Sequence, residues 1–215
     1  MYMAGSLTRD AFSGPPVPPI EGGWGDGGGS PEGRGSSRGA SFTGIYCLMA
    51  ATTMVFAAFT SAMVVRRGMS GDWVSTHKPA ILWANTAALL LSSVALELAR
   101  RALRARARDQ FNVWWTIGTV LGILFLVGQA MASLELRRHG VFLSTNPSAA
   151  FFYILTAAHA AHLFGGASAL VYVDVQALRL RLGPAKRTAI DVSTIFWHFL
   201  DGLWVYLMVL FYLWG

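Results

Sequence analysis

The sequence is poor in cysteine and in charged residues, and each shortage excludes a class of protein. Its single cysteine, Cys47, excludes an internal disulfide, a cysteine-ligated iron–sulfur site and the C-x-x-C-H motif that attaches haem covalently. Charged residues make up 13% and hydrophobic residues 54% of the chain, whereas soluble domains carry roughly 25% charged residues. The composition therefore indicates an integral membrane protein. We interpret Cys47 as a small apolar packing residue.

The N-terminal region lacks long apolar runs and is dominated by Gly, Ser and Pro, as in "GPPVPPIEGGWGDGGGSPEGRGSSRG". Such a composition cannot bury enough apolar surface to offset the entropy lost on ordering. It also lacks the basic start, apolar core and cleavage site of a signal peptide. We therefore expect residues 1–40 to form a disordered tail and residues 41–215 to form a transmembrane domain.

Apolar segments long enough to cross a hydrocarbon core of about 30 Å fill the rest of the chain. Backbone polar groups must be satisfied internally in lipid, so each segment is expected to be a helix. The predicted fold is thus an all-α bundle of five transmembrane helices. The segments are Phe42–Val65, Pro79–Ala99, Val113–Glu135, Ala149–Leu178 and Ile190–Trp214.

Lysine and arginine are distributed unevenly between the connections, which predicts orientation. Twelve lie in the tail, the second-to-third connection and the fourth-to-fifth connection, and five lie in the other two connections. The positive-inside rule then places the N-terminus in the cytoplasm and the C-terminus on the opposite side of the membrane.

Three histidines lie within the apolar segments, where titratable groups are costly and deserve a functional hypothesis. His159 and His162 are three residues apart and share one face of the fourth segment, and His198 is on the fifth. Together they could hold zinc or copper. However, two ligands on one helix are unusual for haem, so we favour helix packing and lipid contact over a ligand role.

Acidic residues embedded in the apolar segments can likewise have either a functional or a packing role. Asp201 lies three residues after His198, so the two can meet on one helix face, either in a proton relay or, as we favour, in packing. Asp174, near the cytoplasmic end of the fourth segment, is expected to contact a lipid headgroup or a partner. Glu97 lies one helical turn before Arg101, which favours an ion pair at the segment end.

Other patterns concern helix contacts. Asn85 and Ser92 are seven residues apart on the second segment and, with Thr86 and Trp83, are expected to form a docking face for another subunit. Small residues that let helices approach closely are expected at two interfaces. They are Gly118 and Gly122 in the third segment and Ala157, Ala161, Gly165 and Ala169 in the fourth. The closing aromatics are expected at the outer membrane interface. They are Trp204, Tyr206, Tyr212 and Trp214.

Three of these stretches, in this order, resemble helices of subunit III of haem–copper cytochrome and quinol oxidases. "LWANTAALLLSSVALELA" is similar to the family's N-T…S-S helix. "STNPSAAFFYILTAAHAAHLFGG" resembles its aromatic–His-x-x-His–Gly helix, and "WHFLDGLWVYLMVLFYLWG" resembles its closing W-H-F-x-D-x-x-W helix. The resemblance covers roughly residues 42–215.

The resemblance implies a five-helix, non-catalytic subunit whose helices surround a V-shaped cleft that binds phospholipid. It implies no cofactor in this chain, with haem and copper in partner subunits. The partners implied are the catalytic subunit I, subunit II, small subunits and phospholipids, and no nucleic acid. The family supports proton uptake and oxygen access, and His159, His162, His198 and Asp201 match positions that shape its helix contacts and cleft.

One position departs from the family pattern. Thr52 in "LMAATTMVFAAFTSA" lies where the family commonly carries a glutamate, so a proton-collecting role there is not implied for this chain. Other functions left open are an accessory subunit of a nitric oxide reductase, a free-standing haem or metal protein using the three histidines, and a small transporter. The missing internal repeat counts against the transporter.

Overall fold

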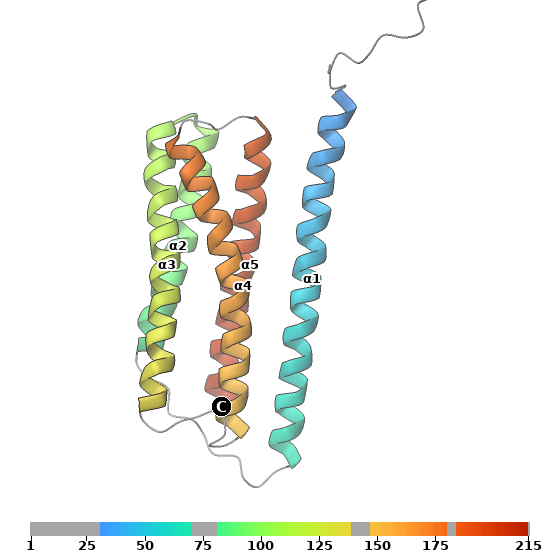
Figure 1. The fold of residues 1–215 in the computed structure, drawn as a ribbon, viewed down its shortest axis with the longest axis vertical. Helices are drawn as coiled ribbons and strands as arrows, with labels where there is room; N and C mark the ends of the chain where they lie inside the picture. The colour runs from blue at the N-terminus through green and yellow to red at the C-terminus, as the bar shows by residue number, and fades with distance from the viewer. Residues whose placement is uncertain (1–30, 70–80, 139–146, 180–183, 215) are drawn as a thin grey trace, which may run out of the picture.

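The computed structural model confirms an all-α membrane fold in the part of the chain that it describes. That part is residues 31–69, 81–138, 147–179 and 184–214. Its five helices are α1 (Pro31–Met69), α2 (Ile81–Arg104), α3 (Arg108–Arg138), α4 (Pro147–Leu178) and α5 (Pro184–Trp214) (Figure 1). All five are long and apolar enough to cross a membrane. The chain is therefore a multi-pass membrane protein.

The helices extend beyond most of the predicted apolar segments. α1 begins at Pro31, so residues 31–40, which the sequence assigned to the tail, are helical. Proline is well tolerated in a first helical turn, and extending an existing helix costs far less than starting one. Residues 1–30 and Pro79 lie outside the described residues, so the division into a tail and a membrane domain stays a prediction.

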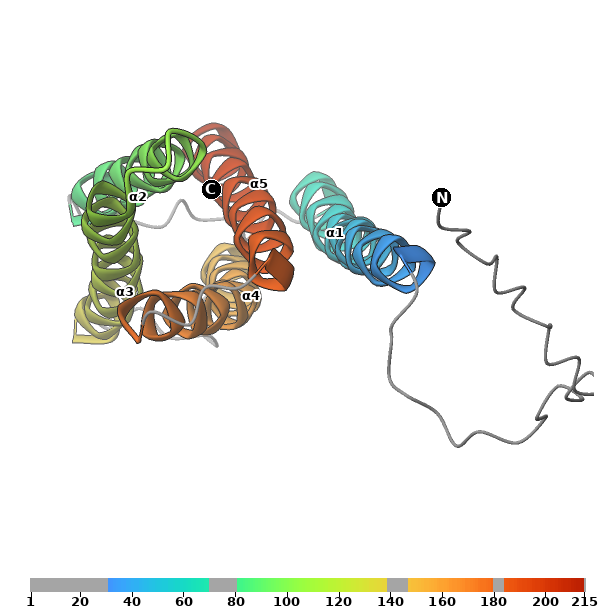
Figure 2. The ribbon, with the colours of Figure 1, turned by 90° about the horizontal axis from the view of Figure 1, so that it is seen from above.

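Four helices surround a common core, and the fifth lies at its side. Figure 2, seen along the bundle, shows α2, α3, α4 and α5 in a ring, with α1 outside it next to α5. α2 and α3 form an antiparallel pair joined by residues 105–107, and they share the most extensive contact of any two helices described. The turn is tight because Arg106 adopts a left-handed backbone conformation, with φ at 61°.

Helix α1 contributes little to the core. Only Thr52, Phe56 and Met63 are buried among its described side chains, and they touch α4 and α5. Its remaining surface is available to lipid or to another subunit, where apolar side chains are stable without being buried in protein. The packing role expected for Cys47 is wrong within this chain, because its side chain is exposed on α1.

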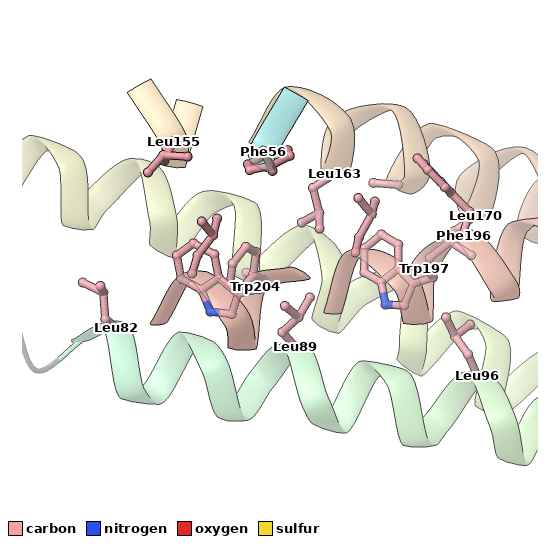
Figure 3. Packing of buried hydrophobic residues seen from close by; sticks show 14 of the residues in the cluster. Phe56, Leu82, Leu89, Leu96, Leu155, Leu163, Leu170, Phe196, Trp197 and Trp204 are labelled. Atoms are coloured by element: carbon pink, nitrogen blue, oxygen red, sulfur yellow. The ribbon is translucent and has the colours of Figure 1, made fainter. Parts of the chain in front are cut away.

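The core itself is built from large apolar side chains on the inner faces of α2 to α5 (Figure 3). Trp197 and Trp204 of α5 are fully buried in it. The interfacial position expected for Trp204 is therefore wrong: it lies on the inward stripe of α5, and its indole N–H donates to the Thr86 hydroxyl of α2 at 3.0 Å. Tyr206 and Tyr212 are exposed, as the interfacial expectation requires.

The small residues predicted at helix interfaces allow close helix approach on α3, but most of those predicted on α4 do not. Gly118 and Gly122 are buried against α2 and α5, where an added Cβ would come within 2.8 Å of Leu96 and 2.6 Å of Trp197, respectively. This confirms the G-x-x-x-G prediction. The stripe on α4 instead faces mostly outward: Ala157, Ala161 and Gly165 are exposed.

Candidate functional site

His159 lies at the centre of the bundle in an aromatic enclosure. Its ring is fully buried and stacks on Trp204, with ring centres 5.1 Å apart and planes 28° apart. Phe125 of α3 and Phe56 of α1 present their edges to it, each with ring centres 6.4 Å away. Neither ring nitrogen makes a hydrogen bond to the described residues. His159 therefore joins α1, α3, α4 and α5 through ring packing.

His162 has different surroundings, although it is on the same helix. It is half-buried, and its Nδ1–H donates to the Ala158 carbonyl of its own helix at 2.8 Å. Its ring centre lies 5.8 Å from that of Phe56, so both histidines contact the same α1 side chain. In the described part of the chain, no three His, Cys, Asp or Glu side chains come together as metal ligands could. The three membrane histidines thus do not converge on one point.

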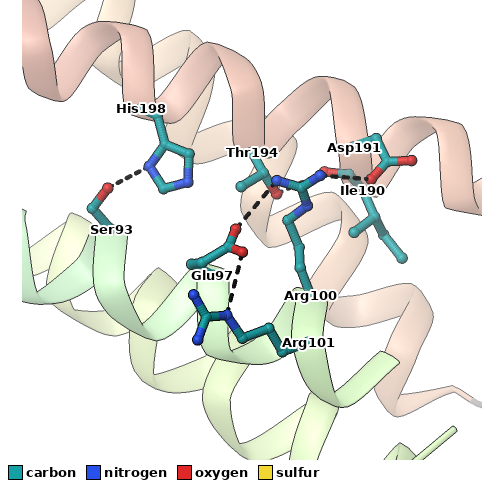
Figure 4. A network of polar contacts seen from close by, with 8 residues as sticks. All are labelled: Ser93, Glu97, Arg100, Arg101, Ile190, Asp191, Thr194 and His198. Carbon is teal, nitrogen blue, oxygen red and sulfur yellow. Dashed lines mark hydrogen bonds and ion pairs between the residues drawn. The ribbon is translucent and has the colours of Figure 1, made fainter. Parts of the chain in front are cut away.

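His198 forms its hydrogen bond with α2 rather than with Asp201. Nδ1 of His198 shares a hydrogen bond with the Ser93 hydroxyl of α2 (Figure 4). Asp201 is buried, and its carboxylate oxygens make no hydrogen bond to the described residues. The two residues are one helical turn apart on α5, as the sequence spacing predicts, and they form no hydrogen bond with each other.

A pocket of about 450 Å³ lies between α1 and α5 in the middle of the membrane region, and His198 forms part of its wall. The other wall residues are mostly apolar. They are Thr53, Phe56, Ala57, Phe199, Gly202, Leu203 and Tyr206. The Tyr206 hydroxyl donates to Thr60 at 3.1 Å and so links α5 to α1 beside the pocket. A hydrocarbon chain or a small apolar molecule is the kind of occupant that such walls accept.

The polar face of α2 is used mainly inside this chain. Ser92 is fully buried and donates to the Gly118 carbonyl of α3 at 2.7 Å. Asn85 is buried against Gly128 of α3, where an added Cβ would lie 2.8 Å from its Cγ. Thr86 accepts the hydrogen bond from the Trp204 indole described above. Of the four residues expected at a docking face, only Trp83 points outward, with 64% of its surface exposed.

Two more contacts join α3 to α4 near the end where α4 finishes. Asp174 is half-buried and accepts a hydrogen bond from the Thr116 hydroxyl of α3 at 2.8 Å. One turn away, the Trp115 indole N–H donates to the Leu170 carbonyl at 3.1 Å. The carboxylate of Asp174 therefore has a partner within this chain.

Thr52 of α1 lies where the family pattern has a glutamate. It is buried, and its hydroxyl donates to the Leu48 carbonyl of its own helix at 2.8 Å.

A cluster of ion pairs connects α2 to α5 at the same end of the bundle (Figure 4). The predicted pair of Glu97 and Arg101 is confirmed, with Oε1 and Nε 3.5 Å apart. Sequence reasoning missed Arg100, whose guanidinium lies 3.2 Å from Glu97 and 3.4 Å from Asp191 of α5. Arg38 of α1 approaches Asp191 at 3.9 Å. No local sequence pattern indicates the ion pairs with Asp191, because Asp191 is far from Arg100 and Arg38 in the sequence.

Comparison with known proteins agrees with this arrangement. A family model described as "Cytochrome c oxidase subunit III" matches residues 40–215. Cytochrome c oxidase subunit 3 of Corynebacterium diphtheriae is 32% identical over 146 residues, which cover 66% of this chain and 71% of that protein. A probable cytochrome c oxidase subunit 3 of Mycobacterium leprae is 26% identical over 162 residues, covering 74% and 80%.

A third relative is covered over a larger share of both chains. Cytochrome c oxidase subunit 3 of Thermostichus vulcanus is 28% identical over 177 residues, which cover 79% of this chain and 85% of that protein. These relatives bear the names of oxidase subunits, so the nitric oxide reductase alternative is not favoured. By the extent of the family match, by these relatives and by its five membrane helices, the chain belongs to the cytochrome c oxidase subunit III family.

Proposed function

We propose that this accessory subunit of a terminal oxidase supports a catalytic subunit in a bacterial plasma membrane and does no redox chemistry itself. Haem and copper are carried by the partner subunits I and II. Cytochrome c is the proposed electron donor, because the relatives reported above are named as cytochrome c oxidase subunits.

The observation that best supports this proposal is the packing of aromatic rings around His159. A metal site needs several donor side chains directed at the same point. Aromatic rings pack around His159 instead, and within the described residues no three His, Cys, Asp or Glu side chains come together as metal ligands could. Its role is to hold four helices together, which is what an accessory subunit needs.

The pocket between α1 and α5 supports the lipid and oxygen side of the proposal. Its apolar walls suit an acyl chain or dissolved oxygen, and it adjoins His198 and the α1 residues Thr53 and Phe56. The exposed apolar surface of α1 and the outward Trp83 are the proposed contacts with the catalytic subunit. His162, His198, Asp201 and Asp174 are proposed to support the helix contacts and the lipid-lined cleft.

The orientation proposed is N-terminus in the cytoplasm and C-terminus outside. The arginines near the ends of α2 and α4 and the start of α5 then lie on the cytoplasmic side, where anionic lipid and the positive-inside rule favour them. A cysteine-accessibility experiment on either terminus would test this orientation.

The function is tested by purifying the affinity-tagged chain in mild detergent and identifying its partners by mass spectrometry. The expected result is co-purification of oxidase subunits I and II, with iron and copper in the complex. After dissociation, the isolated chain should carry neither metal by elemental analysis. Stoichiometric iron or copper on the isolated chain, or a chain that never associates with an oxidase, would contradict the proposal.

A further inference from the structure

At one end of the bundle, arginines from three helices line a pocket of about 540 Å³. Three of them flank apolar segments: Arg38 precedes the apolar run that begins at Phe42, Arg104 is the last residue of α2, and Arg187 precedes the apolar run that begins at Ile190. The remaining wall residues combine charge with apolar surface. They are Phe42, Arg100, Leu103, Asp191 and Ile195.

The charges in this pocket are unbalanced. Four arginines line it against a single carboxylate, Asp191. That carboxylate is already engaged by Arg100 at 3.4 Å and approached by Arg38 at 3.9 Å. Arg104 and Arg187 are exposed and form no ion pair with the described residues. The pocket therefore holds excess positive charge that an anion can neutralise.

Arg100 is held in place at the pocket wall. Glu97 and Asp191 fix its guanidinium from both sides, at 3.2 and 3.4 Å (Figure 4). Arginine binds phosphate through several N–H groups at once, so a guanidinium held in place at the wall of this pocket is suited to recognise a phosphate oxygen.

We propose that this pocket binds the phosphate of an anionic phospholipid headgroup. Basic pockets between transmembrane helices at the membrane surface bind such headgroups. These arginines flank the apolar parts of their helices, so the pocket lies at headgroup depth. Phe42, Leu103 and Ile195 supply apolar surface for the glycerol and upper acyl region, which a free phosphate ion would not use.

The bound lipid has a structural consequence for α1. This helix lies outside the ring of the other four, and in the described part of the chain its backbone packs against α4 and α5 (Figure 2). The pocket takes Arg38 and Phe42 from α1, and its other residues from α2 and α5. A headgroup in the pocket joins α1 to both of them at the membrane surface. The site is separate from the α1–α5 pocket that contains His198, and it does not depend on the proposed function.

The test compares lipid binding by purified oxidase complexes that contain the wild-type chain or a variant. Delipidated complexes are titrated with dioleoylphosphatidylglycerol, dioleoylphosphatidylcholine or inorganic phosphate, and native mass spectrometry counts the lipids bound. The variant Arg104→Gln/Arg187→Gln removes the two exposed arginines. Arg179→Gln is the matched control, because Arg179 is an exposed arginine just after α4, at the same end of the bundle but outside the pocket.

The expected result is about thirtyfold weaker phosphatidylglycerol binding in the double variant, because each arginine near an anionic lipid contributes about a fivefold change in affinity. The control should bind as the wild type does, and Arg104→Lys/Arg187→Lys should restore most of the affinity. Wild-type binding should also weaken as salt rises from 50 to 500 mM. This salt titration tests the site without mutation if the double variant fails to assemble.

Three results would overturn the proposal. One is unchanged phosphatidylglycerol affinity in the double variant, and another is an equal loss in the Arg179→Gln control. The third is loss of ligand selectivity. Phosphatidylcholine binding equal to that of phosphatidylglycerol would show no preference for an anionic headgroup, and equal binding of inorganic phosphate would show a site for a free ion.

Discussion

Gly122 offers the sharpest test of how α3 packs against the rest of the bundle. A Cβ added at this position would lie 2.6 Å from Cζ2 and Cη2 of Trp197, whereas non-bonded carbons are most stable about 3.5–4.0 Å apart. Trp197 cannot easily move away, since its side chain is fully buried. The substitution Gly122→Ala therefore forces either α3 or the indole to shift.

The size of the effect follows from two opposed contributions. Overpacking a well-packed core lowers the free energy of unfolding by about 1–3 kcal/mol. Replacing glycine by alanine within a helix raises it by about 1 kcal/mol. Gly165→Ala is the matched control, because Gly165 lies inside α4 with nothing within 4 Å of an added Cβ. The helix-propensity gain is common to both variants. Gly122→Ala should thus be less stable than Gly165→Ala by about 1–3 kcal/mol.

The measurement is unfolding of the isolated full chain in detergent, so that partner contacts at Gly165 play no part. A double-mutant cycle with Trp197→Phe isolates the contact, because phenylalanine lacks the ring atoms that the new Cβ meets. In the Trp197→Phe background, Gly122→Ala should lose most of its cost. If Gly122→Ala and Gly165→Ala are equally stable in the wild-type background, the close packing of α3 against Trp197 is refuted.

Substitutions at three further positions test individual contacts and one backbone conformation. Ser92→Ala removes the hydrogen bond to the Gly118 carbonyl and should cost about 0.6 kcal/mol in an unfolding titration, the usual value for such bonds in membranes; a stabilising effect would contradict its role in joining α2 to α3. His159→Phe preserves the ring packing and should cost less than about 1.5 kcal/mol, whereas His159→Ala should cost about 3–5 kcal/mol. Neither should change the haem spectrum of an intact complex, and a changed spectrum would point to a ligand. Arg106→Gly should raise stability by up to about 1 kcal/mol by relieving the left-handed backbone, and a loss of stability would show that the arginine side chain matters more.

Local features were predictable from the sequence. Five spans follow from length and hydropathy alone, because lipid permits only helices in a chain of this kind. The pair of Glu97 and Arg101 was predictable because both belong to one helical turn. The close approach at Gly118 and Gly122 was predictable because only small residues allow it.

Which side of each helix faces the protein was decided only in the tertiary structure. In water, a polar stripe marks the outer face of a helix, but in lipid the outer face is apolar as well, so periodicity carries little information. For this reason Trp204 was expected at the interface and is buried, and Cys47 was expected in the interior and is exposed. The small residues predicted at a helix interface on α4 likewise face mostly outward, since Ala157, Ala161 and Gly165 are exposed.

The ionic cluster of Arg38, Arg100 and Asp191 at the membrane surface also could not be predicted from the sequence. Its members come from three helices that are far apart in the sequence, and only the packing of α1, α2 and α5 brings them together. The amino-acid sequence by itself determined that the chain crosses the membrane in five helices, because hydrocarbon imposes that on any sufficiently long apolar segment. The tertiary structure decided which side chains meet, because contacts between helices depend on rotation and register that a uniformly apolar surface does not specify.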